Sequence, residues 1–224
     1  MFQQTFPTLS NQYIADDGLQ KMLLKFFSAA QKAEMNNDFI RFGELVATKI
    51  DSLAKEAESN EPYLIKYDSF GHQIDEIKIS SAWKELKRIS AIEGLVAIPY
   101  EKNKSSSSRL IQMIKIYMFS GGCAVYSCPL AMTDGAAHLL QDINHEIFQS
   151  LTSRDPEKFW TSGQWMTEKI GGSDVSNIET EAIKTESGYE LNGLKWFTSS
   201  TDSDMAIVLA KIKQDGNLDM VKSN

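Results

Sequence analysis

In the last third of the chain, Thr167 and Ser173 flank a glycine pair, Gly171-Gly172, and Asp174 directly follows Ser173. Two consecutive glycines let the backbone take positive φ and let its amides approach a ligand with no Cβ in the way. The Ser173 hydroxyl and nearby amides can donate to an anion such as a pyrophosphate, and Thr167 can donate to the edge of a heteroaromatic ring. Because Gly-Gly and Ser-Asp are also ordinary loop residues, a surface turn that ends a strand is the alternative interpretation.

A second segment, Tyr189 to Ser199, contains Lys195-Trp196-Phe197 and leads to the apolar run 206–210. In order and spacing, these segments resemble the signature of the acyl-CoA dehydrogenase family, in the part of its middle domain that cradles FAD. The chain is most similar to the AidB-like branch, which has Met-Thr-Glu-Lys before Gly-Gly-Ser-Asp-Val and Lys-Trp-Phe ahead of a serine. The stretch Tyr67 to Glu76, followed by Trp83, is also similar to that branch.

The resemblance implies a role for each residue of these motifs. Thr167 is expected to hydrogen-bond the isoalloxazine edge, and Ser173 to lie near the pyrophosphate and also to touch the acyl-CoA substrate. Many members have tryptophan and threonine where this chain has Phe197 and Ser199, so Phe197 is expected to pack on the flavin and Ser199 to hydrogen-bond it. The complete expected FAD-binding set is Gln164, Trp165, Met166, Thr167, Gly171, Gly172, Ser173, Phe197, Thr198 and Ser199.

The chemistry implied by the resemblance is removal of the substrate's α-proton by a carboxylate, with transfer of a β-hydride to the flavin. The family's catalytic glutamate lies in a C-terminal helical bundle, and no carboxylate of this chain matches it. We interpret Glu168 and Asp174, which lie within the motif, as groups that fix the loop by accepting backbone hydrogen bonds. We therefore expect an N-terminal portion of the enzyme that is inactive alone and binds FAD weakly or not at all.

For the full-length protein the resemblance implies an acyl-CoA substrate, an electron-accepting flavoprotein as partner, and a homo-oligomer, either dimer or tetramer. The AidB-like branch leaves a second hypothesis open, a flavoprotein tied to protection of DNA against alkylation. A third is a non-catalytic, truncated regulator that dimerises with a full-length partner. The net charge of −7 and the pI near 5.1 disfavour nucleic-acid binding by this segment, because such affinity rests largely on a basic surface.

The remaining reactive side chains give no other site. Cys123 and Cys128 are too few for a disulfide scaffold or a four-cysteine zinc site, which favours a reducing compartment. His138 and His145 lie too far apart for a helical metal pair, and we interpret His72 as a solvent-exposed loop residue. Residues 1–17 lack lysine and arginine, so they predict neither a signal nor a transit peptide, and no run is long enough to span a membrane. We expect a cytoplasmic or organellar-matrix protein.

Apolar spacing predicts a series of packed helices before residue 152, after an extended, partly docked arm at 1–17. The predicted inward stripes include Met22, Leu23 and Phe26 in the first helix and Leu110, Met113, Ile114 and Tyr117 in the fourth. The small residues at 120–124 allow either close helix packing or room for a ligand tail. The predicted helices are 19–30, 36–60 with Asp38 as cap, 80–94 with Trp83, Leu86, Ile89 and Ile92 inward, 109–119 and 131–147.

Beyond residue 157 the period of the sequence becomes alternating, which predicts strands at 178–183, 189–191 and 205–212 with hairpin signals at Ser187-Gly188 and Asn192-Gly193. We expect 63–78 to be irregular with a turn at Gly71, and 103–108 to be a polar loop. The predicted fold class is α+β: an all-α helical domain at 1–157, followed at 158–224 by an incomplete antiparallel β-domain that carries the FAD motif. The C-terminal helical bundle of the family is missing.

Overall fold

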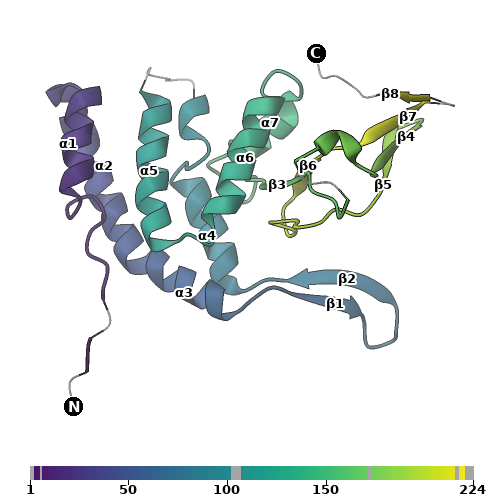
Figure 1. Ribbon diagram of the computed structural model, residues 1–224. Helices are drawn as coiled ribbons and strands as arrows, with labels where there is room; N and C mark the ends of the chain where they lie inside the picture. Colours follow the sequence, from purple (N-terminus) through teal and green to yellow (C-terminus); the bar gives the residue numbers. More distant parts are fainter. Residues whose placement is uncertain (1–2, 6, 102–106, 171–172, 215–216, 220–224) are drawn as a thin grey trace.

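The computed structural model describes residues 3–5, 7–101, 107–170, 173–214 and 217–219 (Figure 1). A helical region comes first and a β-rich region follows it, so the predicted α+β class is confirmed. The helices are α1 (Asp17–Phe26), α2 (Ala29–Leu45), α3 (Asp51–Ser59), α4 (Ser81–Ile92), α5 (Ser108–Gly122), α6 (Ser127–Leu140) and α7 (His145–Leu151). The strands are β1 (Tyr63–Tyr67), β2 (Gln73–Lys78), β3 (Ser162–Trp165), β4 (Glu181–Thr185), β5 (Gly188–Asn192), β6 (Met205–Val208), β7 (Lys211–Gln214) and β8 (Asn217–Asp219).

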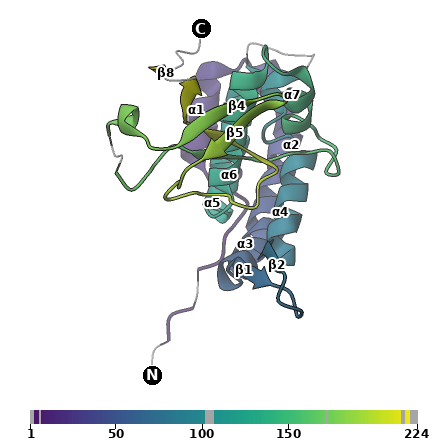
Figure 2. The same cartoon turned by 90° about the vertical axis from the view of Figure 1, so that its right-hand side faces the viewer.

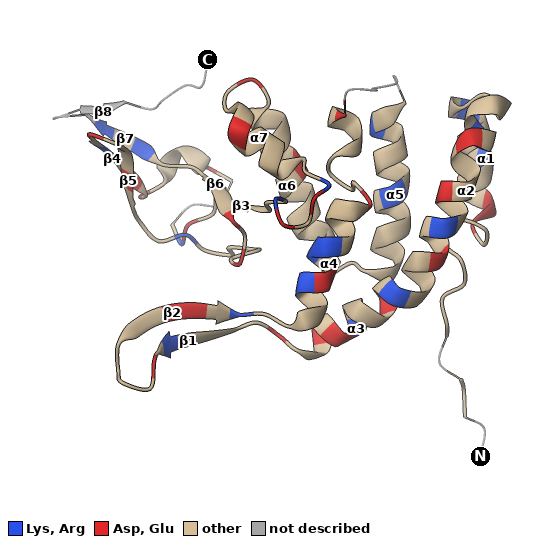
Figure 3. Cartoon of the chain, turned by 180° about the vertical axis from the view of Figure 1, so that it is seen from behind, with Lys and Arg blue, Asp and Glu red and all other residues tan. Residues whose placement is uncertain are grey.

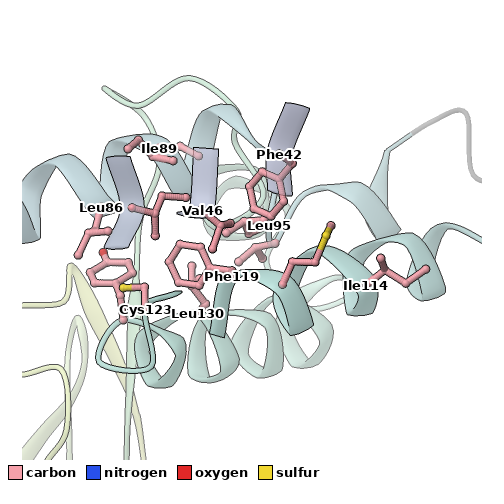
Figure 4. Packing of buried hydrophobic residues seen from close by; sticks show 14 of the residues in the cluster. Phe42, Val46, Leu86, Ile89, Leu95, Ile114, Phe119, Cys123 and Leu130 are labelled. Atoms are coloured by element: carbon pink, nitrogen blue, oxygen red, sulfur yellow. The ribbon is translucent and has the colours of Figure 1, made fainter. Parts of the chain in front are cut away.

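The core of the helical region lies between α2, α4, α5 and α6 (Figure 4). Phe42, Leu86, Phe119 and Leu130, one from each of these helices, are fully buried. Each such side chain contributes roughly 1.5–3 kcal/mol relative to an exposed one. This core fixes the helices that support the β-rich region.

The predicted stripes of three helices are partly wrong. In α1, Leu23 is buried as predicted, whereas Met22 and Phe26 are exposed. In α5, Ile114 is buried but Met113 and Tyr117 are exposed. The inward face of α5 also includes Gln112 and Lys115. Their burial is tolerated because Gln112 donates to the Leu95 carbonyl and Lys115 to the Glu93 carboxylate. Hydrophobic periodicity cannot detect such buried polar positions. The predicted inward residue Ile92, at the end of α4, is exposed as well.

The second helix begins well before its predicted start. Ser28 accepts a hydrogen bond from the Gln31 backbone N–H (3.3 Å), and the Gln31 side chain accepts one from the Ser28 N–H (2.9 Å). Asp38 is therefore not a cap but a mid-helix residue, and it pairs with Arg41 and Lys115. From α2 the chain passes through a π-helical turn, Val46–Ile50, directly into α3.

The small-residue patch allows close packing. A Cβ on Gly122 would lie 2.7 Å from Val46 Cγ1 and 3.1 Å from the Val46 carbonyl oxygen, and one on Gly121 would lie 2.7 Å from the Gln12 side chain. Gln12 belongs to the N-terminal arm, which docks through Asn11 Nδ2 on the carbonyl of Ile40 (2.9 Å). Figure 2 shows the residues before this contact extending away from the body. The arm is thus partly docked, as predicted.

Two further predictions in the helical part are wrong. Residues 63–78 form an antiparallel hairpin, β1–β2, rather than an irregular stretch, so the region is not all-α. Gly71, with φ +86°, lies in the turn as predicted. The predicted helix 131–147 is two helices, because Asn144 caps a separate α7 by accepting a hydrogen bond from the Ile147 N–H (3.1 Å). Most of the predicted loop 103–108 lies outside the described residues.

The β-rich region is mixed rather than antiparallel. β3 pairs in parallel with β6, and a second sheet has the order β5-β4-β7-β8, in which β4 and β7 are parallel. The predicted strand 205–212 is in fact two strands in different sheets. The hairpin turn lies between β4 and β5 and not at Asn192-Gly193. Instead, Gly193 permits close approach to Thr180, whose Cα would lie 2.7 Å from an added Cβ.

Candidate functional site

The first motif segment emerges from β3, which is anchored on the helical region. Ser162 is buried, and its N–H donates to Thr133 Oγ1 of α6 (3.0 Å). β3 runs parallel to β6, with Gln164 opposite Ile207 and Trp165 opposite Val208. The strand therefore begins inside the molecule and ends at the surface, where Gln164 and Thr167 are exposed.

The second motif segment lies directly beside the first. Trp165 donates its indole N–H to the Ser199 carbonyl (3.1 Å), and the Trp196 N–H donates to the Thr167 carbonyl (2.9 Å). These two hydrogen bonds place Gln164, Trp165, Met166 and Thr167 next to Phe197, Thr198 and Ser199. Seven of the ten predicted site residues thus come from two adjacent segments.

Glu168 is the buried polar centre of this arrangement. Its carboxylate accepts hydrogen bonds from the Thr180 N–H (3.1 Å), the Thr180 hydroxyl and the Glu179 N–H, and it lies 2.6 Å from Lys195 Nζ. Burial alone would raise the pKa of Glu168, but the hydrogen bonds from Lys195, Thr180 and the backbone outweigh it and lower the pKa to about 2. The interpretation of Glu168 as a loop-fixing group is confirmed, and its carboxylate is not a free base.

Phe197 is held in a strained backbone conformation. Its φ is +54° and its side chain is 82% exposed. A non-glycine residue in this left-handed region costs of order 1–3 kcal/mol and persists only where its neighbours fix it. The ring packs edge-on against Trp196, with 5.7 Å between the centroids, and Lys169 Nζ lies 4.9 Å from the centroid of the Trp196 ring. The site therefore presents an aromatic surface to solvent.

Sequence reasoning missed the residues that hold this second segment on the helical region. Trp83 of α4 donates its indole N–H to Asp202 (2.6 Å), and Lys87, one turn later, lies 2.7 Å from Asp204. Asp204 also accepts a hydrogen bond from the Thr161 N–H (2.7 Å), just before β3. In the sequence, the only signal of this contact was that Asp202 and Asp204 precede the apolar run 206–210. Such a pattern is too common to predict a contact with α4.

The remaining predicted residues are not joined to this cluster. Gly171 and Gly172 lie outside the described residues. Ser173 is exposed, and within the part of the chain that the structure describes no hydrogen bond connects it to Thr167 or Ser199. Its neighbour Asp174 caps the short 3₁₀ turn Val175–Asn177 by accepting a hydrogen bond from the Ser176 N–H (3.1 Å), which confirms it as a loop-fixing group. Hydrogen bonds from the Ser176 side chain and backbone lower the pKa of Asp174.

The three histidines are placed as interpreted. His72, His138 and His145 are exposed. No group of three or more His, Cys, Asp or Glu side chains within the described ranges is arranged to hold a metal ion. Nor does any described helix combine the length and the apolar character needed to cross a bilayer.

Two family profiles match the chain. Residues 7–157 match the profile described as "Adaptive response protein AidB N-terminal domain", and residues 163–222 match "Acyl-CoA dehydrogenase, middle domain". The chain belongs to the acyl-CoA dehydrogenase family. Within it, the chain is 39% identical to acyl-CoA dehydrogenase family member 11 of Caenorhabditis elegans over 96% of its own length and 37% of the relative. It is 29% identical to the putative acyl-CoA dehydrogenase AidB of Escherichia coli, over 94% of the chain and 41% of the relative.

Two solved structures have the same fold over nearly the whole of this chain. The crystal structure of C. elegans ACDH-11 in complex with C11-CoA matches with a TM-score of 0.91 and 39% identity, over 97% of this chain and 39% of that one. The structure of Bd2924 in its apo form matches with a TM-score of 0.88 and 42% identity, over 96% of this chain and 45% of that one. The chain therefore spans about two fifths of the length of the curated relatives it matches.

Proposed function

We propose that this chain is the N-terminal portion of an FAD-dependent acyl-CoA dehydrogenase and supplies one wall of its flavin site. The observation that carries the proposal is the pairing of the β3 exit with the segment Lys195–Ser199, through the Trp165–Ser199 and Trp196–Thr167 hydrogen bonds. A flat ring needs donors along one edge and an apolar surface against one face. The exposed Thr167 and Ser199 and the strained, exposed ring of Phe197 fit that requirement.

Each residue has a proposed task in holding FAD. Thr167 and Ser199 hydrogen-bond the edge of the flavin ring, and Phe197 packs on its face. Gln164, Trp165, Met166 and Thr198 line the same wall. The amides of Gly171-Gly172 and the hydroxyl of Ser173 bind the pyrophosphate, and Ser173 also contacts the acyl-CoA. When bound, FAD accepts the hydride from the Cα–Cβ bond of the acyl chain.

The chain does not supply the catalytic base of this reaction. Glu168, a carboxylate within the motif, is buried, already accepts several hydrogen bonds, and has its pKa lowered to about 2. We propose that the base belongs to another part of the full-length protein, which acts as a dimer or tetramer and passes its electrons to an acceptor flavoprotein. We also retain the proposed division into domains at 1–157 and 158–224, which the profile matches to 7–157 and 163–222 support.

DNA protection receives no support from the described surface. Figure 3 shows lysine and arginine interleaved with aspartate and glutamate along the helices rather than gathered in one stripe. Together with the net charge of −7 of the whole chain, this pattern disfavours binding of a phosphate backbone.

Flavin titration tests the proposal at two levels. The full-length protein should bind FAD tightly, and the 224-residue chain weakly or not at all, because part of the site is absent from it. In the full-length protein, Thr167→Val and Ser199→Ala should each weaken FAD binding about five- to tenfold, the effect of one lost hydrogen bond. Thr185→Val, on an exposed threonine of the β4–β5 hairpin, is the matched control. A full-length protein without flavin affinity contradicts the function, and sub-micromolar binding by the short chain contradicts the partial site.

A further inference from the structure

The carboxylate of Asp204 joins three separate segments of the chain. Its Oδ2 atom accepts hydrogen bonds from the Thr161 N–H (2.7 Å) and the Thr161 hydroxyl (3.2 Å), and Lys87 Nζ of α4 lies 2.7 Å from the same oxygen. Thr161 is buried, and the Asp204 side chain is 31% exposed. Thr161 directly precedes β3 and Asp204 directly precedes β6, and Figure 1 shows these two strands between α6 and the second sheet. One oxygen atom therefore holds the beginnings of both strands on the helical region.

The register of β3 against β6 depends on a contact of this kind. Over the described residues the two strands form a two-stranded parallel sheet whose first pair is Ser162 opposite Met205. In an antiparallel hairpin the turn fixes the register, whereas parallel strands are joined by long connections that leave it open. A slip of one residue would turn every side chain of β6 to the opposite face of the sheet. The hydrogen bonds between Thr161 and Asp204 lie directly beside the first pair and would be broken by such a slip.

The turn before β6 transmits the position of Asp204 to the second motif segment. The Ser203 N–H donates to the Ser200 carbonyl (3.1 Å), and the hydroxyl oxygens of these two serines are 2.6 Å apart. Ser200 has a φ of +55°, so its neighbours fix its backbone. Ser199 directly precedes this turn, and its carbonyl accepts the indole N–H of Trp165 on β3 (3.1 Å). A shift of Asp204 along β3 would therefore move Ser199 relative to Trp165.

We propose that Asp204 is a positioning residue of the flavin site: its carboxylate sets the register of β6 against β3 and, through it, the place of Ser199 beside Thr167. The inference rests on the proposed function, because Asp204 acts on the flavin only through these two donors. Both donors must reach one ring edge at the same time, so an error of about 1 Å in their separation removes at least one hydrogen bond. Since all the donors to Asp204 meet at one oxygen, the register requires an acceptor atom at this point rather than a negative charge.

Two substitutions separate the acceptor from the charge. Asp204→Asn keeps a carbonyl oxygen for these donors, whereas Asp204→Leu keeps the size of the side chain without an acceptor. Both lose the ion pair with Lys87, so a role in stability alone would affect them equally. In the full-length protein, Asp204→Leu should weaken FAD binding about tenfold or more in a fluorescence titration, and Asp204→Asn less than about threefold. Glu85→Leu is the matched control, because it removes a carboxylate of α4 that pairs with Lys49 and Arg88, and it should leave FAD binding unchanged.

Hydrogen exchange in the 224-residue chain tests the register without flavin. The indole N–H of Trp165 should exchange about tenfold faster in Asp204→Leu, and at a nearly unchanged rate in Asp204→Asn and Glu85→Leu. NMR of the chain with isotope-labelled tryptophan measures the rates, and Trp165→Phe assigns the signal.

Unchanged exchange at Trp165 in Asp204→Leu overturns the proposal, and so do equal losses of FAD affinity in Asp204→Leu and Asp204→Asn. A full-length protein that binds no flavin refutes the proposed function and the flavin role of Asp204 with it. The exchange rates then decide by themselves whether Asp204 sets the register of the two strands.

Discussion

Lys195 Nζ lies 2.6 Å from Glu168 Oε1, and both side chains are more than nine-tenths buried. This ion pair connects the first motif segment to the second, next to the backbone hydrogen bond between Trp196 and Thr167. Thr180 and Glu179 complete the hydrogen bonding of the carboxylate, so the charge is compensated inside the protein. The relative position of the two segments therefore depends on a buried electrostatic contact and not on apolar packing alone.

Replacement of Lys195 by methionine should lower the free energy of unfolding by about 3–5 kcal/mol, because it leaves a buried carboxylate without its counter-charge. Urea denaturation measures this change. Lys213→Met is the matched control, because Lys213 pairs with Glu181 in an exposed position. This substitution should lower the free energy of unfolding by at most about 1 kcal/mol. Equal effects of the two substitutions would show that the Glu168 pair does not hold the site.

The pH dependence of stability should report Glu168. Its pKa in the folded chain, about 2, lies below the ordinary value of 4.5, so the ionised carboxylate stabilises the fold above pH 4.5 and this stabilisation is lost as the pH falls towards 2. The pKa of Glu85 is also lowered to about 2, by its hydrogen bond from Arg88 and its contact with Lys49. The stabilisation that Glu85 contributes is therefore lost over the same pH range. The comparison must therefore be with Glu168→Gln, which should be less stable at neutral pH and lose less between pH 5 and pH 3. Parallel curves for the two proteins would contradict the assignment.

Phe197→Gly should raise the free energy of unfolding by roughly 1 kcal/mol, because glycine adopts φ +54° without strain and little buried surface is lost. Phe70→Gly removes an equally exposed phenylalanine from a position without positive φ, and should give no such gain. Thermal denaturation distinguishes the two. In the full-length protein the same Phe197→Gly substitution should weaken FAD binding, a trade of stability for function that a purely structural residue would not show.

Gly122→Ala should destabilise the helical region by about 1–3 kcal/mol, because the added methyl group would lie 2.7 Å from Val46 Cγ1 and 3.1 Å from the Val46 carbonyl oxygen. Gly135→Ala is the comparison on α6, where nothing beyond the adjoining residues and the backbone of the helix itself lies within 4 Å of the new Cβ. It should stabilise the fold by about 0.5–1 kcal/mol through helix propensity. Guanidinium denaturation of both variants provides the comparison. If Gly122→Ala left the free energy of unfolding unchanged, α5 would be able to move away from Val46 without loss of stability.

The sequence predicted the local chemistry of the site better than its long-range contacts. Glu168 and Asp174 could be interpreted as loop-fixing groups, because carboxylates at turns usually accept nearby amides. The contact of Trp165 with Ser199 could not be predicted, since its acceptor is a backbone carbonyl, which any residue at that position would supply. The support from Trp83 and Lys87 depends on residues more than a hundred positions away from Asp202 and Asp204.

The fold was predicted where the hydrophobic period is unbroken. The β1–β2 hairpin was missed because the bulge at Asp75 interrupts the alternation of two on which strand prediction depends. The face of α5 was misassigned because Lys115, a cation, is buried beside Glu93 (3.0 Å). The parallel pairing of β3 with β6 joins segments far apart in the chain, for which a single sequence contains no register signal.

The π-helical turn at Val46–Ile50 makes the helices around it sensitive to chain length. Val46 and Ile50 are fully buried, and Ala54 and Ala57 of α3 are buried after them. Each residue of an α-helix advances the direction of its side chain by about 100°. A one-residue deletion that turned this wide turn into a regular one would rotate all of α3 by that angle and move its alanines out of the core. Side chains in this stretch can be exchanged for others of similar size, but the number of residues in it cannot change without repacking the helical region.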